Sequence, residues 1–576
     1  MKMKKMLILA GLAFALVFSG CGSSETVADY DQAVTASDKD EDKASDEDKD
    51  SDDDKDSDDD KDSKDDKDSK DKDKDGSGKD GDDDGESQLQ FINTYFDDSK
   101  YDDESNIGLY FQCFGNHILL PFESEKAYPR LAASLRELAD QEEKFFRDEV
   151  REFKDDALEF AKEMNENGAS AYYSHYAEDV LKRADDKCVS VLRVVNGFLG
   201  GAHPDYYYET YNYDPKTGER IRLSDVIKDQ KKLNEILEKK LVEDYPDVEY
   251  FGLSESLAGY DMSALETGDD DDEEVVYAYA FTLDPDGVSF YFSPYGISAY
   301  AYGDQIVKIL YSEEPSLFKE DYAVEGPYIS YMTDRDNKYG IDGKVESIGV
   351  IRDDYEENGM FKTLRAYKGD SEAKIDDLYY YSMSPFIAKT DDDKYFMYVI
   401  ANMESDYKEF IIFDMNGKEP VRNELKDKAN YTYMDYFDDD NGVYGTMVST
   451  DPENMLLAER CDLLSTYNAC GRYEMDDKGL PELKGDYLEV PGEYVLTSIA
   501  DLTSDIVDEE GEVKEKDVVI PKGEEYRLYR TDGEKIVDAK LSDGRIVRME
   551  VSPDYPHKVN NTISEDALFK ELYYAG

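Results

Sequence analysis

Histidine, the side chain most often used for proton transfer and metal binding, is scarce in this sequence. There are four histidines, and no two stand at the spacing of a His-Glu-x-x-His zinc motif. His203 draws attention because it follows two glycines and precedes three tyrosines in "GFLGGAHPDYYYETYNY". His203 lies between Ala202 and Pro204, where a turn depends on backbone geometry and not on chemical reactivity. We therefore first interpret His203 as shaping the turn. Contact with a partner is the second interpretation, and catalysis the third. The four are His117, His175, His203 and His557.

Other patterns of catalytic chemistry are missing as well. We find no Gly-x-Ser-x-Gly elbow, no P-loop and no Rossmann fingerprint between a strand and a helix. The 138 acidic residues hide any carboxylate pair, so a glycoside hydrolase is unsupported by the sequence without being excluded. No cofactor and no metal site are predicted, and the protein is expected not to be an enzyme.

Tyrosine dominates the aromatic residues, with 48 tyrosines and no tryptophan. Tyrosine joins apolar area to a hydroxyl group, a combination typical of recognition surfaces. The lack of tryptophan, which commonly lines the clefts of sugar hydrolases, weighs slightly against that class. The candidate partner-binding residues are His203, Tyr206, Tyr207, Tyr208 and Tyr295.

The N-terminal residues 1–21, "MKMKKMLILAGLAFALVFSGC", have a basic start and a short apolar run. That pattern predicts a secretory signal, because a membrane span needs about 20 apolar residues. Ser19 and Gly20 before Cys21 resemble the bacterial lipoprotein box. The resemblance implies that the Cys21 thiol carries acyl chains such as palmitate, so the protein is expected on the extracellular face of a Gram-positive cell membrane. An ordinary signal peptide is the alternative.

Residues 22–87 predict a disordered acidic stalk. Between Asp38 and Glu86 there are 27 acids and 11 lysines, and no aromatic or branched apolar residue. Such a segment buries too little apolar surface to offset the entropy of ordering. A partial calcium-loop match, Asp80-x-Asp82-x-Asp84, has Phe91 where a glutamate ligand is required, and we interpret it as chance.

The formal charge of the chain is −71. A protein this acidic repels nucleic acid and anionic lipid and attracts cationic partners over long range. Solubility in a crowded exterior explains the same charge equally well.

Four cysteines remain after Cys21, and none lies in a Cys-x-x-Cys metal motif. In an exported protein they are expected to form two disulfides, for which Cys113–Cys188 and Cys461–Cys470 are the simplest pairs. Free thiols are the alternative in a reducing environment.

Residues 88–320 alternate between strand and helix patterns, which predicts an α+β layer structure. Strands are expected over 107–122, 171–181, 187–198 and 205–213, with a helix between the first two. A second helix follows Ser224. "VVYAYAFTLDPDGVSFYFSP" then predicts a hairpin with an Asp-Pro-Asp-Gly turn.

The segment "GGAHPDYYYETYNYDPKTGERIRLSDVI", with "FTLDPDGVSFYFSPYGISAYAYGDQIVKI" after it, resembles the extracellular C-terminal domain of RsiV-type anti-sigma factors, which sense lysozyme. The same pair of modules precedes the catalytic domain of PdaC-type peptidoglycan deacetylases. The resemblance covers about Ile107 to Tyr311. It implies a companion module over 88–185, a lysozyme-binding type of domain over 186–314, and an antiparallel sheet with packed helices that has no catalytic role.

The rest of the chain is expected to be β-rich over 321–480, with strands joined by Asp- and Gly-containing turns. Residues 481–576 resemble a bacterial SH3-like barrel, with short strands and Asp-Gly turns. Barrels of this type bind cell-wall peptide in some proteins and only pack in others.

Three functions are consistent with these observations. The first is a lipid-anchored surface protein that captures a cationic protein such as lysozyme. The second is a cell-wall enzyme, such as a glycan hydrolase, with a catalytic acid among the carboxylates. The third is a scaffolding lipoprotein that holds cell-wall polymer or partner proteins. The expected partners are therefore the membrane and a cationic protein, with cell-wall polymer as a further candidate and no nucleic acid.

Overall fold

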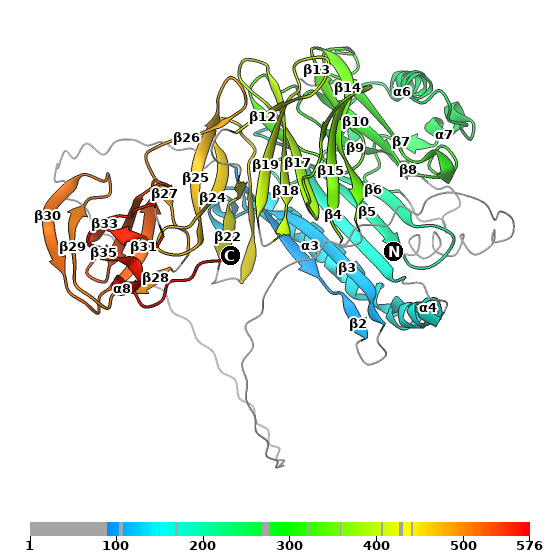
Figure 1. Cartoon of the computed structure of the whole chain (residues 1–576). Coiled ribbons are helices and arrows are strands. Elements are labelled where there is room, and N and C mark those ends of the chain that lie inside the picture. Colours follow the sequence, from blue (N-terminus) through cyan, green and yellow to red (C-terminus); the bar gives the residue numbers. More distant parts are fainter. Residues whose placement is uncertain are drawn as a thin grey trace, which may run out of the picture. The chain divides into compact units, whose positions relative to one another are not determined.

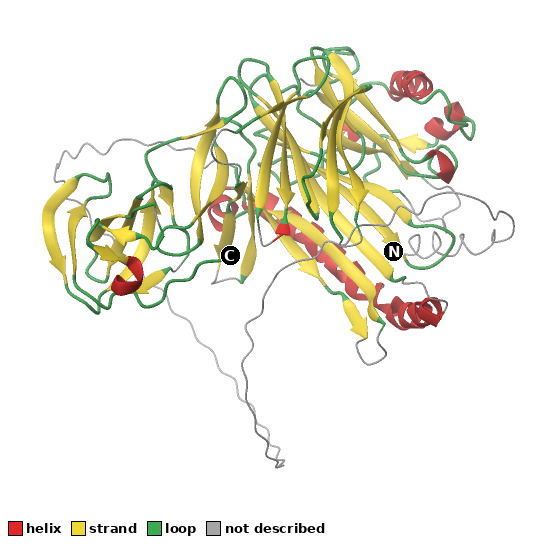
Figure 2. Cartoon of the chain, in the orientation of Figure 1, coloured by secondary structure: helices red, strands yellow, loops and turns green. Residues whose placement is uncertain are grey.

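The computed structural model describes most of the chain after residue 88, and strands dominate the described part (Figure 2). The predicted signal peptide with Cys21, and the predicted stalk, lie outside the described residues. No described helix is long and apolar enough to cross a membrane. The described ranges are 89–102, 107–148, 150–166, 171–267, 276–319, 322–356, 359–404, 407–425, 430–438, 442–492, 494–553 and 555–575.

The first sheet is completed by a pairing between strands far apart in sequence. Strand β1 (Phe91–Asp97) pairs antiparallel with both β3 and β23, so the first described strand is internal to the sheet. The strand order is β22-β23-β1-β3-β4-β5-β6, with β2 paired to β3. The predicted regions 88–320 and 321–480 therefore share this sheet. The other members are β2 (Lys100–Asp102), β3 (Gly108–Leu119), β4 (Tyr173–Ala184), β5 (Val189–Phe198), β6 (Asp205–Tyr213), β22 (Asp435–Asp438) and β23 (Val443–Val448).

Helices connect β3 to β4, which run parallel (Figure 1). A parallel pair needs a crossover connection, and here it runs through α3. Proline suits the first position of a helix, and α3 begins at Pro129. The predicted single helix is interrupted by a 3-10 turn before α4. The connection consists of α2 (Phe122–Ala127), α3 (Pro129–Asp148), η2 (Val150–Phe153) and α4 (Lys154–Glu166).

A second core forms between a three-stranded sheet and three helices. The hairpin of β9 and β10 has the predicted position, and β10 also pairs with β11. Helix α6 buries Leu233, Leu237 and Leu241 in this core. The elements are α5 (Leu223–Val226), α6 (Gln230–Asp244), α7 (Leu253–Ala258), β7 (Tyr260–Asp261), β8 (Tyr277–Ala278), β9 (Ala280–Leu283), β10 (Gly287–Phe292), η3 (Tyr300–Tyr302) and β11 (Gln305–Leu310).

The middle of the chain forms two sheets, and the five-stranded sheet has no solvent face at its centre. Alternate residues of β18 (Tyr395–Asn402) enter two cores: Phe396 and Tyr398 face one, and Met397 and Val399 face the other. The sheet order is β12-β17-β18-β19-β20, and the four-stranded sheet is β13-β14-β15-β16. The other bounds are β12 (Tyr328–Tyr331), β13 (Asn337–Ile341), β14 (Lys344–Tyr355), β15 (Phe361–Lys368), β16 (Ser371–Ile375), β17 (Ser382–Lys389), β19 (Lys408–Asp414) and β20 (Val421–Asn423).

The C-terminal strands do not show the expected SH3-like barrel. They continue an open eleven-stranded sheet that begins with β21, β24 and β25, so the predicted boundary at residue 480 falls within one sheet and one core. The sheet comprises β21 (Tyr431–Tyr433), β24 (Met455–Cys461), β25 (Tyr467–Met475), β26 (Pro481–Leu483), β27 (Leu488–Glu489), β28 (Val495–Thr497), β29 (Leu502–Val507), β30 (Val513–Ile520), β31 (Glu525–Thr531), β32 (Ile536–Leu541) and β33 (Ile546–Glu550). After it come β34 (Lys558–Val559), β35 (Ile563–Ser564) and α8 (Glu565–Leu568).

The two expected disulfides are not formed in the structure. The four cysteines of the described chain are free and buried. Cys461 lies opposite Tyr467 and Cys470 lies opposite Ala458, so the two thiols are three residues out of register. That offset is about 10 Å along a strand, beyond the reach of a disulfide. Strand β4 lies between the strand of Cys113 and the strand that follows Cys188.

We expect the unfolding temperature of the protein to be the same with and without a reducing agent, because no cross-link is lost. Burial raises the pKa of Cys188 and Cys470 to about 12, so these thiols are also unreactive in the folded state. Ellman's reagent should label Cys113, Cys188, Cys461 and Cys470 only after denaturation. A denatured mass lower by two hydrogens per cysteine pair would contradict this expectation.

Candidate partner-binding surface

His203 belongs to a tight turn between β5 and β6. Gly200 and Gly201 adopt φ angles of 90° and 115°, which side-chain-bearing residues rarely take up. The His203 Nδ1 donates to the Pro204 carbonyl at 2.9 Å, and the Tyr300 hydroxyl donates to the same carbonyl at 2.7 Å. The His203 ring stacks on Tyr300, with ring centroids 3.7 Å apart. His203 therefore shapes the turn and is part of an aromatic stack.

Tyr295 completes this stack from the turn that follows β10. Its hydroxyl lies 3.3 Å from His203 Nε2, and its ring lies 5.7 Å from that of Tyr300. The residue is 55% exposed and has a φ of 67°, which is uncommon for a bulky side chain. Hydrogen bonds from its amide to Ser298 and from Gly296 to Ser293 hold this conformation. The turn thus holds an aromatic ring at the surface in a strained backbone state.

The tyrosines of β6 are fixed by a carboxylate and a guanidinium. The Tyr206 hydroxyl donates to Asp304 at 2.9 Å, and the Tyr208 hydroxyl donates to the other oxygen of that carboxylate. Burial, and then the charge of Asp304, raise the pKa of both phenols, which stay neutral donors. The Arg335 guanidinium lies over the Tyr206 ring, 4.4 Å from its centroid.

The structure brings three of the five predicted residues together. His203, Tyr206, Tyr295 and the unpredicted Tyr300 form a group that we call the His203 cluster. Tyr208 is buried beside this cluster. Tyr207 alternates to the opposite face of the sheet, where burial, and then the charges of Glu209 and Glu142, raise its pKa.

Two further residues of this surface carried no signal in the sequence. Asp304 and Arg335 reach it from segments distant in the chain, and both were missed for that reason. Tyr300 lies in the segment "SAYAYGD" with Tyr302. The sequence shows these two tyrosines but does not indicate that Tyr300 stacks on His203.

Acidic groups border the His203 cluster. Asp205 Oδ1 lies 3.6 Å from His203 Nδ1, and the Asp205 side chain is largely exposed. Burial nevertheless raises the pKa of Asp205, while His203 lowers it. Aromatic faces next to carboxylates suit a cationic group, because the rings and the charges attract it together.

A second polar position lies on β4, at Glu178. The residue is exposed to solvent overall. Desolvation of its carboxyl group by surrounding protein atoms nevertheless raises the pKa of Glu178 to about 7. Asp334 raises the pKa further, and Arg352 opposes both effects. Burial, together with the charge of Glu178, raises the pKa of Tyr95 on β1. A carboxyl group that titrates near neutrality is a candidate general acid.

A cluster of charged side chains lies in the interior beside the turn between β9 and β10. The Lys308 ammonium is fully buried and lies 2.8 Å from Asp284 and 2.5 Å from Asp286. Lys182 reaches the same region from β4 and donates to the Tyr331 carbonyl at 2.8 Å. Burial lowers the pKa of Lys182 to about 8, although Asp284 opposes this. We call these four charged side chains the lysine–aspartate junction.

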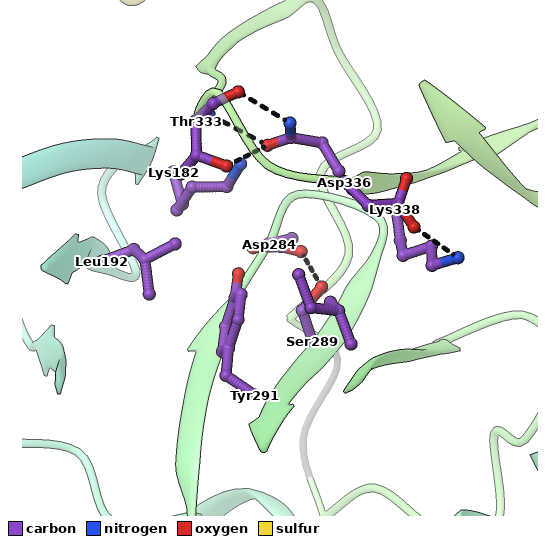
Figure 3. Close-up of a pocket in the computed structure, with 10 residues that line it drawn as sticks. Lys182, Leu192, Asp284, Ser289, Tyr291, Thr333, Asp336 and Lys338 are labelled. Carbon is purple, nitrogen blue, oxygen red and sulfur yellow. Dashed lines mark hydrogen bonds and ion pairs between the residues drawn. The ribbon is translucent and has the colours of Figure 1, made fainter. Parts of the chain in front are cut away.

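A cavity adjoins this junction, and Figure 3 shows Lys182, Asp284 and Tyr291 around it. Its volume is about 10 Å³, roughly the space of one water molecule. A substrate does not fit there. The lowered pKa of Lys182 and the close carboxylates therefore belong to internal packing.

A separate buried network lies between the first sheet and α3. Arg193 donates to both oxygens of Asp179, at 2.6 and 2.9 Å, and to Glu142 at 3.1 Å. His175 Nε2 lies 3.0 Å from Glu142, and His117 Nδ1 lies 3.7 Å from Asp179. Two of the four histidines thus have structural positions. Within the described ranges, no three His, Cys, Asp or Glu side chains are grouped to hold a metal ion.

These features define a strand-rich α+β protein with an exposed aromatic surface. Within it, residues 224–312 match the model of the family "Protein of unknown function (DUF3298)", so the chain contains a DUF3298 domain. The match covers the helices and sheet of the second core, and it includes Tyr295 and Tyr300 but not His203.

Two crystal structures are among those similar to this chain. A member of the DUF3298 family from Bacteroides fragilis is 19% identical with a TM-score of 0.30, and the alignment covers 40% of this chain and 94% of that one. A DUF3298 family protein from Pseudomonas aeruginosa is 15% identical with a TM-score of 0.27, covering 41% and 97%. No curated protein matches the chain.

Replacing Lys308 with methionine should destabilise the protein by about 3–5 kcal/mol, because Asp284 and Asp286 lose their buried counter-ion. Urea unfolding measures the change. Lys240→Met is the matched control, since Lys240 forms a partly exposed pair with Glu313, and its cost should stay below about 1 kcal/mol. Equal effects of the two substitutions would contradict a specific role for the lysine–aspartate junction.

Proposed function

We propose that this chain is a lipid-anchored binding protein of the bacterial cell surface that captures a cationic protein through the His203 cluster. The lipoprotein-type N-terminus and the acidic segment after it support the location. The resemblance of residues 107–311 to RsiV-type and PdaC-type modules supports an envelope-facing role and makes lysozyme the first partner to test. The observation that carries the proposal is the set of fixed aromatic rings beside Asp205, of which Tyr295 is exposed and the others are half-buried.

The contacts within the cluster suit recognition because they fix the rings before a partner arrives. The Tyr300 hydroxyl is held by the Pro204 carbonyl, and the Tyr206 hydroxyl is held by Asp304. Rings that are already ordered lose little conformational entropy on binding. Tyrosines in such positions commonly supply the largest share of binding energy at protein interfaces.

The same surface already contains one example of the expected contact. The Arg335 guanidinium lies over the Tyr206 ring, so this surface accommodates a guanidinium on an aromatic face. An arginine or lysine of a partner can use the exposed ring of Tyr295 in the same way, with Asp205 supplying opposite charge.

The charge of the chain, −71, adds attraction at distances beyond contact. Electrostatic steering raises the association rate and declines as salt screens the charges. Capture of a cationic protein should therefore be strongest at low ionic strength.

Calorimetry of the full chain with lysozyme should give measurable binding that weakens as salt rises from low to physiological concentration. Tyr295→Ala should weaken binding at least tenfold, because the exposed ring is lost, whereas Tyr295→Phe should retain most of it. Tyr555→Ala, a change at a ring that is 77% exposed elsewhere, is the control. Absence of heat at both salt concentrations would rule out lysozyme as the partner, and full binding by Tyr295→Ala would rule out this surface.

Glu178 favours a second candidate function, hydrolysis of a cell-wall glycan. A general acid must be protonated, and a pKa of about 7 keeps Glu178 partly protonated at neutral pH. Asp334 is the charged neighbour that would act as the second carboxylate.

On this second function, release of soluble fragments from purified cell wall should fall as pH rises through 7, because Glu178 loses its proton. Glu178→Gln should abolish the release while leaving the unfolding temperature at pH 5 unchanged. Glu235→Gln, a change at an exposed helix position, is the control. No release by the parent protein, or release unchanged by Glu178→Gln, would remove the enzyme candidate.

A further inference from the structure

The lysine–aspartate junction contains the three groups that an intramolecular amide bond requires. Lys308 on β11 carries a primary amine, and its Nζ lies 2.8 Å from the carboxylate of Asp284. The carboxylate of Asp286 lies against the same Nζ. The Lys308 side chain is fully buried and the Asp284 side chain is 2% exposed, so the two groups meet away from bulk water. The junction therefore holds a nucleophile against an electrophile and places a proton acceptor beside the nucleophile.

Hydrogen bonds fix the Asp284 carboxyl group in front of the amine. Thr282 Oγ1 donates to Asp284 Oδ1 at 2.8 Å, and the Ser289 hydroxyl donates to Oδ2, as Figure 3 shows for Ser289. Ser289 is paired with Lys308 across β10 and β11, so both side chains approach Asp284 from the same face of the sheet. Reacting groups that a fold holds in contact behave as if their concentration were roughly 10⁵ M or more.

The second lysine of the junction keeps the charges balanced if an amide forms. Lys182 and Lys308 are opposed by Asp284 and Asp286, two charges of each sign. Burial lowers the pKa of Lys182 to about 8, and the charges of both aspartates oppose this effect, so Lys182 is within electrostatic reach of both. An amide between Lys308 and Asp284 removes one charge of each sign and leaves Lys182 as the counter-ion of Asp286. It also removes the desolvation cost of one buried ion pair.

The cavity beside the junction suits the small molecule that such a reaction releases. Lys182, Asp284, Ser289 and Tyr291 are among the residues that line it. Its volume of about 10 Å³ is roughly the space of one water molecule. Both reacting groups belong to the chain, so no external substrate has to enter. The cavity therefore has room for the product water at the carboxyl group that loses it.

We propose that Lys308 and Asp284 condense after folding to form an isopeptide bond, with Asp286 as the proton acceptor. The bond joins the turn between β9 and β10 to β11 inside the DUF3298 domain. It depends neither on partner capture by the His203 cluster nor on hydrolysis by Glu178.

The three protons of the Lys308 ammonium account for the whole reaction. Burial lowers the pKa of Lys308, but Asp284 and Asp286 outweigh it and raise the pKa above its ordinary value, so the pair starts charged. The first proton passes to Asp284, which gives a neutral amine and a carboxylic acid; burial assists this transfer because it disfavours both charged forms. The amine lone pair then attacks Asp284 Cγ. Asp286 takes the second proton from the nitrogen and gives it to the hydroxyl, which leaves as water when its bond to Cγ breaks. The third proton stays on the amide nitrogen.

Mass spectrometry of the denatured full chain tests the proposal. The parent protein should be lighter than the calculated mass of its polypeptide by about 18 Da, because condensation releases one water. Lys308→Arg keeps the positive charge but lacks the amine, so it should have its full calculated mass. Asp286→Asn removes the proton acceptor and should contain at least tenfold less of the lighter species. Lys240→Met, at the partly exposed pair with Glu313, is the matched control and should show the whole loss.

Digestion of the parent protein locates the bond. Chymotrypsin cleaves after Phe290 and Tyr302, so the peptides that contain Asp284 and Lys308 should be recovered joined, and a reducing agent should not separate them. Unfolding temperatures confirm that the variants are folded, and the joined peptides keep the test informative if a variant is not.

Full calculated mass in the parent protein would overturn the proposal. A loss of water that persists in Lys308→Arg, with the two peptides separate, would also overturn it, in favour of a succinimide between Asp286 and Gly287. A bond that fragmentation places at Asp286 would overturn the roles given to the two carboxylates.

Discussion

Charge neutralisation at Lys308 is the constraint on which the arrangement of the described chain depends. Two carboxylates from the turn between β9 and β10 enter the interior, and Lys308 compensates both. The Asp286 carboxylate also accepts from the Gly340 amide on β13. Lys182 adds contacts from β4 to Tyr331 and Tyr339. The first sheet, the DUF3298 domain and the middle sheets are thereby joined through one set of buried charges, which must stay paired.

The position of Arg335 at the His203 cluster follows from this arrangement. Arg335 lies in the segment between β12 and β13, close in sequence to Tyr331 and Tyr339, so the lysine–aspartate junction also places the guanidinium that covers Tyr206. This edge of the first sheet therefore places aromatic rings next to a carboxylate, Asp205, an arrangement that suits a cationic group.

Local pattern predicted the local elements well. Alternation of apolar residues marked β3, β4, β5, β6 and the β9–β10 hairpin close to their observed bounds, because each strand buries one face against a neighbour. The Asp-Pro-Asp-Gly turn was recognised as a turn, but its burial was not, since turns of this composition are usually solvated. Likewise, the alternation of side chains along β6 predicts that Tyr206 and Tyr207 lie on opposite faces. It does not predict that Tyr206 reaches the His203 cluster while Tyr207 faces α3.

Long-range pairing was beyond prediction from sequence. Nothing local indicates that β1 pairs with β23, or that C-terminal strands extend a sheet that begins before residue 480, because pairing partners are chosen by the completed core. For this reason the sequence did not indicate that strands on both sides of residues 320 and 480 share sheets. Of the His203 cluster, the sequence supplied His203, Tyr206 and Tyr295, whereas Asp304 and Arg335 required the fold.

The internal position of β1 has a mechanical consequence. Any tension applied through the N-terminus reaches this strand before the rest of the described chain. An edge strand could peel away one hydrogen bond after another, but β1 is bonded along one side to β3 and along the other to β23. Pulling along its axis loads many of these bonds at once, in shear. The residues that would first bear a force applied at the N-terminus are thus held between two neighbouring strands, one of which comes from the distant second half of the chain.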